Sequence, residues 1–155
     1  MIDRQPVTDA VQTLLATLTG KPVGLATVPI NPATNTPYPP PYTLLYPLDH
    51  SSDDGTLADR HKAAVSDYQA TFVSGPKPGQ PDSRGTVVQA QWLADKGRKL
   101  IERPVDGSPG YRHALTIQGV NCYRREAREA GGTSDENDAI LTSVIRFRFY
   151  LEATA

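Results

Sequence analysis

Proline and glycine divide this chain into segments, and that division constrains the fold more than any other feature of the sequence. The 155 residues include 14 prolines and 12 glycines. They fall between patterned segments and not inside them. Because proline lacks a backbone N–H and glycine permits left-handed turns, both residues mark the ends of helices and strands. The sequence therefore predicts short regular elements joined by long loops rich in proline and glycine.

Two of the segments have the one-sided apolar pattern of an amphipathic helix. Their apolar positions are Val7, Val11, Leu14, Leu15 and Leu18 in the first, and Ala90, Leu93, Ala94, Gly97, Leu100 and Ile101 in the second. Pro6 suits the first turn of the first helix and Gly20 suits its end, whereas the second should end before Pro104. Small residues in the second helix should let it lie close to a sheet.

Five further segments are typical of strands. They are Pro22–Ile30, Tyr42–Leu48, Val65–Val73, Leu115–Tyr123 and Leu141–Glu152. The last alternates most clearly, with phenylalanines on one side and arginines on the other. The sequence thus predicts an α+β fold, with a mixed, mainly antiparallel sheet packed against two helices. We expect Asn31–Pro41 to be an extended loop outside any sheet and Arg124–Asp138 to be an exposed charged loop.

Length and charge limit the classes of protein to consider. A chain of this length fits one domain, residues 1–155. The net charge of −1 gives no bulk attraction for nucleic acid or an anionic membrane. No apolar run is long enough to span a membrane, and residues 1–10 lack the pattern of a secretory signal. The single cysteine, Cys122, has no partner for an internal disulfide, so we expect a soluble protein that is intracellular or indifferent to redox state.

The segment from Leu48 to His61 concentrates carboxylates and imidazoles, so it must be weighed as a metal site. Its candidate ligands are Asp49, His50, Asp53, Asp54, Asp59 and His61. Their spacing matches neither a calcium-binding EF-hand loop nor a zinc site. Aspartate and glycine collect in turns, so we interpret the segment as a solvated hairpin connection that turns at Asp53–Gly55. A small metal-binding or hydrolytic domain centred on residues 49–61 is the alternative.

No other pattern indicates catalysis. Ser51 and His113 are present, but no nucleophile elbow, phosphate-binding loop or zinc-protease motif accompanies them. We therefore predict no enzyme activity, no catalytic residues, no bound metal and no cofactor. Two features leave alternatives open. Trp92 fits either the core or an interface, and Arg146 and Arg148 form either a solvent face or an interface face of their strand.

Four segments together resemble the tail terminator proteins of long-tailed bacteriophages, especially of phages that infect actinobacteria. They are YTLLYPLD (residues 42–49), VSDYQATFVSG (residues 65–75), QAQWLADKGR (residues 89–98) and VIRFRFYLEA (residues 144–153). The segments are short and none is a catalytic signature. With the first helix and the loops between them, they cover most of the chain in the same order as in that family.

The resemblance implies a structural virion protein. It would form a ring, a homohexamer in this family, at the head-proximal end of the tail tube, where it would stop tube polymerisation and provide the surface that joins the head. Its partners would be further copies of itself, the tail tube protein and the head connector or head-closure protein. DNA would pass through the ring without sequence-specific binding, and no membrane is involved. The protein would be found in the virion tail, and in the host cytoplasm during assembly.

On this hypothesis the acidic segment and one strand face become candidate contact surfaces between subunits. The candidate interface residues are Tyr42, Asp49, Asp53, Asp54, Asp59, Arg146 and Arg148. The loops Asn31–Pro41 and Asp49–Asp59 would extend as contact arms. A different neck or tail component, such as a head-closure or tube protein, is the nearest alternative, because fold alone does not fix the role.

Overall fold

A computed structural model of the chain describes residues 1–55, 62–80, 82–132 and 140–154. The helices are α1 (Arg4–Thr19), α2 (Val87–Arg98) and the 3-10 turn η1 (Lys99–Ile101). The strands are β1 (Val23–Leu25), β2 (Ile30–Asn31), β3 (Thr36–Pro37), β4 (Tyr42–Asp53), β5 (Ala63–Ser74), β6 (Val120–Glu129) and β7 (Leu141–Ala153). The predicted α+β class is confirmed.

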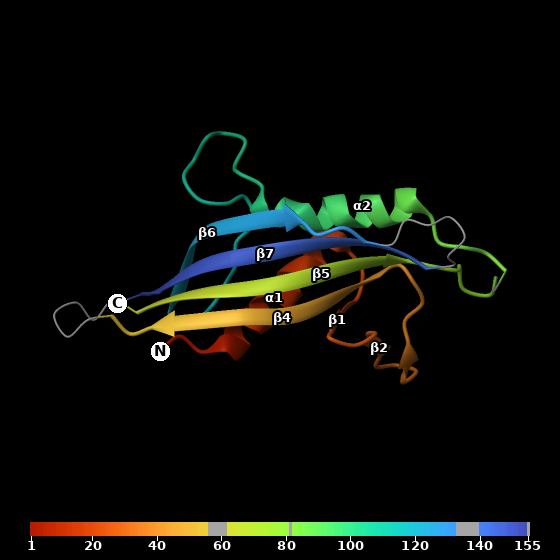
Figure 1. Cartoon of the computed structure of the whole chain (residues 1–155), viewed down its shortest axis with the longest axis horizontal. Coiled ribbons are helices and arrows are strands. Elements are labelled where there is room, and N and C mark those ends of the chain that lie inside the picture. Colours follow the sequence, from red (N-terminus) through yellow and green to blue (C-terminus); the bar gives the residue numbers. More distant parts are fainter. Residues whose placement is uncertain (56–61, 81, 133–139, 155) are drawn as a thin grey trace.

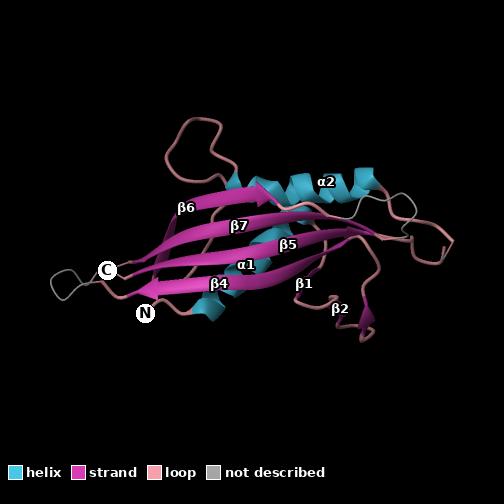
Figure 2. Cartoon of the chain, viewed as in Figure 1, coloured by secondary structure: helices cyan, strands magenta, loops and turns pink. Residues whose placement is uncertain are grey.

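One main sheet of five strands organises the molecule, in the order β1-β4-β5-β7-β6 (Figures 1 and 2). β1 runs parallel to β4, and every other pair in this sheet is antiparallel. β5 and β7 lie at its centre and pair along their whole length. The mixed, mainly antiparallel sheet expected from the sequence is therefore present.

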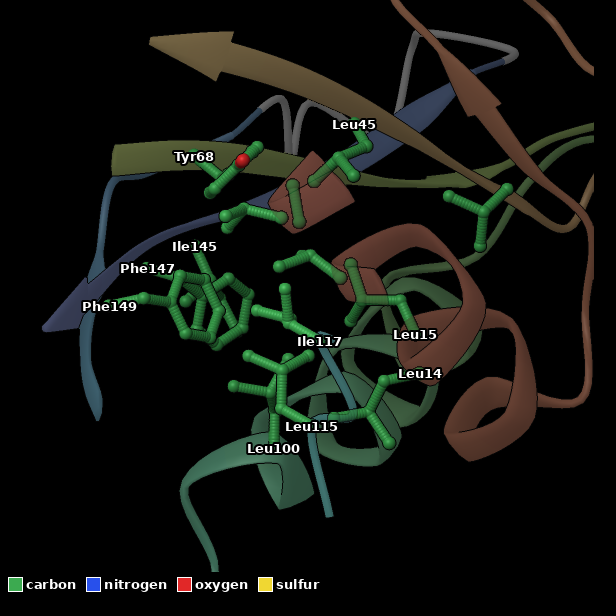
Figure 3. Packing of buried hydrophobic residues seen from close by; sticks show 14 of the residues in the cluster. Leu14, Leu15, Leu45, Tyr68, Leu100, Leu115, Ile117, Ile145, Phe147 and Phe149 are labelled. Carbon is green, nitrogen blue, oxygen red and sulfur yellow. The ribbon is translucent and has the colours of Figure 1, made fainter. Parts of the chain in front are cut away.

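Both helices cover the same face of this sheet, and α1 passes behind the strands in Figure 1. Alternate residues of β5 and β7 point to this face, where Tyr68, Phe72, Phe147 and Phe149 are fully buried. They form one apolar cluster with residues of α1 and α2, in which Leu15 and Leu93 are also fully buried. Figure 3 shows the two phenylalanines of β7 packed beside Leu100, Leu115 and Ile117.

The predicted helices agree with the structure. In α1 the apolar stripe faces the core, and Gly20 ends the helix in the left-handed conformation, with φ of 66°. In α2 the side chain of Thr86 caps the N-terminus by accepting a hydrogen bond from the N–H of Gln89. Gly97 of α2 lies against the ring of Phe72, so the small-residue face does pack close to the sheet.

The first predicted strand, Pro22–Ile30, is mostly wrong. Only β1 is strand within it, apart from Ile30, because the chain turns away at Ala26, which has φ of 57°. The next loop is not wholly outside a sheet either, since β2 and β3 form a small antiparallel hairpin. Its turn is stabilised by Asn31, whose side-chain oxygen accepts from the N–H of Ala33.

β4 is longer than predicted, and this corrects the boundary of the acidic loop. The strand does not end at Leu48 but continues to Asp53 after a bulge between Pro47 and His50. The part of β4 after the bulge lacks the apolar alternation by which a strand is predicted from sequence. Its inward-facing residues His50 and Ser52 are polar and make hydrogen bonds. Residues 56–61, which include Asp59 and His61, lie outside the described part of the chain.

The fourth predicted strand is displaced along the chain. Residues 115–119 make only an isolated bridge, and the strand is β6, which runs into the segment expected to be a charged loop. β6 is an edge strand with one open face, so most of its side chains are polar and it lacks the apolar alternation of a buried strand. β7, in contrast, has the predicted extent within one residue.

Candidate interaction surface

The sheet face opposite the helices carries most of the charged side chains that β5, β6 and β7 provide. We call it the open face. Strand alternation and register place on it Tyr46, Asp49, Asp67, Gln69, Arg124, Glu126, Arg128, Arg146, Arg148 and Tyr150. None of the described helices covers these residues. The open face is therefore where this domain can present charge to a partner.

An arginine–aspartate pair occupies the centre of the open face. Arg148 donates to both carboxylate oxygens of Asp67, with Nε to Oδ1 at 2.7 Å and Nη2 to Oδ2 at 3.0 Å. These hydrogen bonds raise the pKa of Arg148. Two parallel hydrogen bonds fix the orientation of the guanidinium. Because its charge is matched by Asp67, Arg148 is the less available of the two predicted arginines.

A second charged group lies beside it on β6 and β7. Nη2 of Arg124 is 2.7 Å from Oε1 of Glu126, and the hydroxyl of Tyr150 lies 3.4 Å from both oxygens of that carboxylate. The guanidinium of Arg124 also stacks over the ring of Tyr150 at 5.1 Å. Glu126 is thus engaged by neighbours on its own sheet.

Arg128 and Arg146 are the exception on this face. They lie directly opposite each other on β6 and β7, and both are exposed. Within the described residues neither has an ion-pair or hydrogen-bond partner for its guanidinium. Like charges directly opposite each other in a sheet are unfavourable. The two arginines therefore form an unbalanced basic pair.

A shallow hollow of about 350 Å³ spans the open face between β4 and β6. Asp49 lines it on the β4 side, and Arg128 and Arg146 line it toward β6. The carboxylate of Asp49 likewise has no partner within the described part of the chain. The structure therefore brings the predicted residues Asp49, Arg146 and Arg148 to one surface. Asp67 and Arg128 complete that surface and were not among the predicted interface residues.

The strand β4 places the candidate metal ligands Asp49 and His50 on opposite faces of the sheet. Asp49 faces the hollow, whereas His50 points to the helix-covered face, where Nε2 donates to the carbonyl of Ile2 at 3.0 Å and Nδ1 lies 2.6 Å from Oγ of Ser66. Among described residues no three His, Cys, Asp or Glu side chains come together as a metal site. Asp59 and His61 lie outside that range.

Asp53 and Asp54 organise the end of β4. Oδ1 of Asp53 accepts from the N–H of Gly55 at 2.9 Å, a turn that matches the hairpin interpretation. Asp54 pairs with the amino group of Met1, and this hydrogen bond lowers the pKa of Asp54. Both aspartates remain exposed.

Two aromatic residues, Tyr42 and Trp92, differ in their exposure to solvent. Tyr42 lies opposite Val73 on the open-face side, but it is buried, which raises its pKa. Trp92 is 43% exposed on α2, and Nζ of Lys96 lies 5.9 Å from its ring. Of the two readings for Trp92, the structure excludes the buried core.

The side chain of Tyr111 blocks the outer edge of β6, and no sequence pattern predicted this contact. The N–H of Arg125 donates to the hydroxyl of Tyr111 at 2.7 Å, and this hydroxyl donates to the carbonyl of Arg125 at 3.2 Å. The guanidiniums of Arg103 and Arg125 stack on the Tyr111 ring, with Cζ at 4.2 and 4.5 Å from its centroid. Tyr111 therefore occupies the backbone groups that a neighbouring strand would use.

The open face provides charged and aromatic side chains that can contact a partner. None of the described helices is long and apolar enough to cross a membrane. The chain matches no protein-family model and no curated protein.

Proposed function

We propose that this protein is a structural virion component that forms a ring on the head-proximal end of a phage tail tube. In this role it stops tube polymerisation and offers the surface that joins the head connector. Capping works by shape: one surface of the ring matches the last ring of the tube, and the other lacks the surface that a further tube ring needs. DNA passes through the ring without sequence-specific binding.

The placement of the four tail-terminator-like segments is the observation that carries this proposal. They are separated in sequence, yet they form the first two thirds of β4 and most of β5, α2 and β7. β4, β5 and β7 are consecutive strands of the sheet, and α2 packs against β5 and β7. The resemblance therefore falls on one contiguous structural unit and not on scattered loops.

The charge distribution also suits a ring. Cyclic rings use a head-to-tail contact between two different patches of each subunit. On the open face, Asp49 at the β4 side has no ion-pair partner among the described residues, and the unbalanced basic pair lies toward β6. Such a surface has the asymmetry that a head-to-tail contact requires.

Electron microscopy of particles made without this protein tests the proposal. We expect overlong tails that fail to join heads, and normal length and joining when the wild-type gene is supplied in trans. Tails of normal length in its absence would contradict the terminator role. A purified chain that polymerises into tubes by itself would instead identify a tube subunit.

A further inference from the structure

We propose that Arg128 and Arg146 of one copy bind the carboxylate of Asp49 of a second copy, in a side-by-side contact that repeats around the assembly. This inference rests on the proposed ring and names the residues that would hold neighbouring subunits together. It is carried by three observations: the order of charges across the open face, the positions of β4 and β6 at the two sides of that face, and the side chain of Tyr111, which blocks strand pairing at β6.

The charges run from acid to base across the strands. Among the described residues Asp49 on β4 has no partner, and neither do Arg128 and Arg146 toward β6, whereas the Asp67–Arg148 pair between them is neutral. If two copies stand side by side in the same orientation, the β6 side of one meets the β4 side of the next. Each such contact would match the basic pair with the unpaired acid.

Each side of the described sheet ends in a strand edge, and on the β4 side Arg4 donates to the carbonyl of Leu48. β1 pairs with β4 only at residues 43–45, so β4 has no strand neighbour along residues 46–53 within the described sheet. β6 forms the opposite edge. Because Tyr111 occupies the N–H and carbonyl of Arg125, continuous strand pairing is blocked there. The contact is therefore one between side chains.

A discrete carboxylate fits the basic pair better than a nucleic acid does. Asp67 and Glu126 lie one side-chain row away from Arg146 and Arg128 on the same face. A phosphate backbone repeats its charge and would meet these carboxylates, whereas one aspartate need not. Two guanidiniums can bind a carboxylate through several parallel hydrogen bonds, and that would relieve their mutual repulsion.

Charge reversal tests the contact in the full-length chain by sedimentation velocity at low and high salt. We expect Arg128→Glu and Asp49→Arg each to raise the dissociation constant about tenfold or more. Carrying both changes in one chain should restore assembly, and so should mixing the two single variants, because each contact then has opposite charges. Lys77→Glu, which makes the same kind of charge change on an exposed loop, should have no effect.

Several results would overturn the inference. They are a wild-type chain that stays monomeric at low salt, single reversals that leave assembly unchanged, and a double variant that does not recover although circular dichroism shows it folded. Duplex DNA binding that Arg128→Glu abolishes, with self-association unchanged, would assign the basic pair to nucleic acid. Overlong tails in particles without the protein, together with unchanged assembly of the reversals, would reject this contact and leave the proposed function standing.

Discussion

Gly97 of α2 lies so close to the ring of Phe72 on β5 that a Cβ at position 97 would overlap the ring atoms Cζ and Cε1. The ring is fully buried, so any shift of it would disturb packed neighbours. This contact sets how closely the second helix approaches the sheet.

We therefore expect Gly97→Ala to destabilise the protein, although alanine favours a helix more than glycine does. An overpacking cost of about 1–3 kcal/mol should outweigh the gain of about 1 kcal/mol in helix propensity and leave a net loss of up to about 2 kcal/mol. Urea unfolding measures it. In a Phe72→Leu background the same substitution should cost less, and an equal cost in both backgrounds would show that the ring is not the obstacle.

The Asp67–Arg148 pair should contribute a measurable coupling energy. Its two hydrogen bonds are well formed and Asp67 is only 19% exposed on its side chain, but Arg148 is 49% exposed, so solvent screens the interaction. A double-mutant cycle with Asp67→Asn and Arg148→Met should give about 0.5–1 kcal/mol. The Arg124–Glu126 pair, with both side chains more exposed, provides a comparison that should give less.

Removing the Tyr111 hydroxyl should unblock the edge of β6. Tyr111→Phe keeps the ring against Arg103 and Arg125 but leaves the Arg125 N–H and carbonyl without their partner. We expect a loss of about 1 kcal/mol in stability and increased self-association through strand pairing. Light scattering during storage measures the second effect. If Tyr111→Phe behaves as wild type, water replaces the hydroxyl and the edge is protected in another way.

Glu102 should contribute to the acid sensitivity of the fold. It accepts from Nε2 of His113 at 3.2 Å and pairs with Arg112 at 3.1 Å, and these contacts lower its pKa below the ordinary 4.5. A lowered pKa in the folded state means that the stabilisation is present above that ordinary value and is lost as the pH falls through the lowered pKa. Glu102→Gln should flatten the decline in unfolding free energy over this range.

Urea titrations at a series of acidic pH values check this prediction. Asp9→Asn serves as the control, because it removes an exposed carboxylate on α1 that has no ion-pair partner among the described residues. A pH profile of Glu102→Gln that follows the wild-type profile would mean that the contacts of Glu102 persist in the unfolded chain or are too weak to matter.

Sequence patterns predicted the elements in which apolar residues recur on one face. They missed elements whose inward-facing residues are polar and are stabilised by hydrogen bonds to distant parts of the chain. β7 was predicted within one residue because phenylalanines and arginines mark its two faces. β6 was displaced because its helix-facing positions include Arg125 and Ala127, which do not look like core residues, although Arg125 is buried and Nη1 donates to the carbonyl of Leu100 at 2.8 Å. Such partners are remote in sequence and leave no local pattern.

The candidate surface was predictable to a similar extent. The two arginines of β7 could be assigned to one face by alternation. That Arg148 is paired and Arg146 is not, within the described residues, depends on Asp67, which lies on another strand. Arg128 could not be chosen because its segment was interpreted as a loop. A revised strand boundary would have placed it opposite Arg146.

Successive side chains of β7 point alternately to the helices and to the open face. The same register therefore fixes both the buried phenylalanines and the exposed arginines of this strand. Deleting a single residue near its start would shift Phe147 and Phe149 to the positions of Arg146 and Arg148, and would drive the arginines beneath the helices. The chain therefore cannot slide its surface charges along this strand independently of its core. New charges can be acquired there only by substitution, one alternate residue at a time.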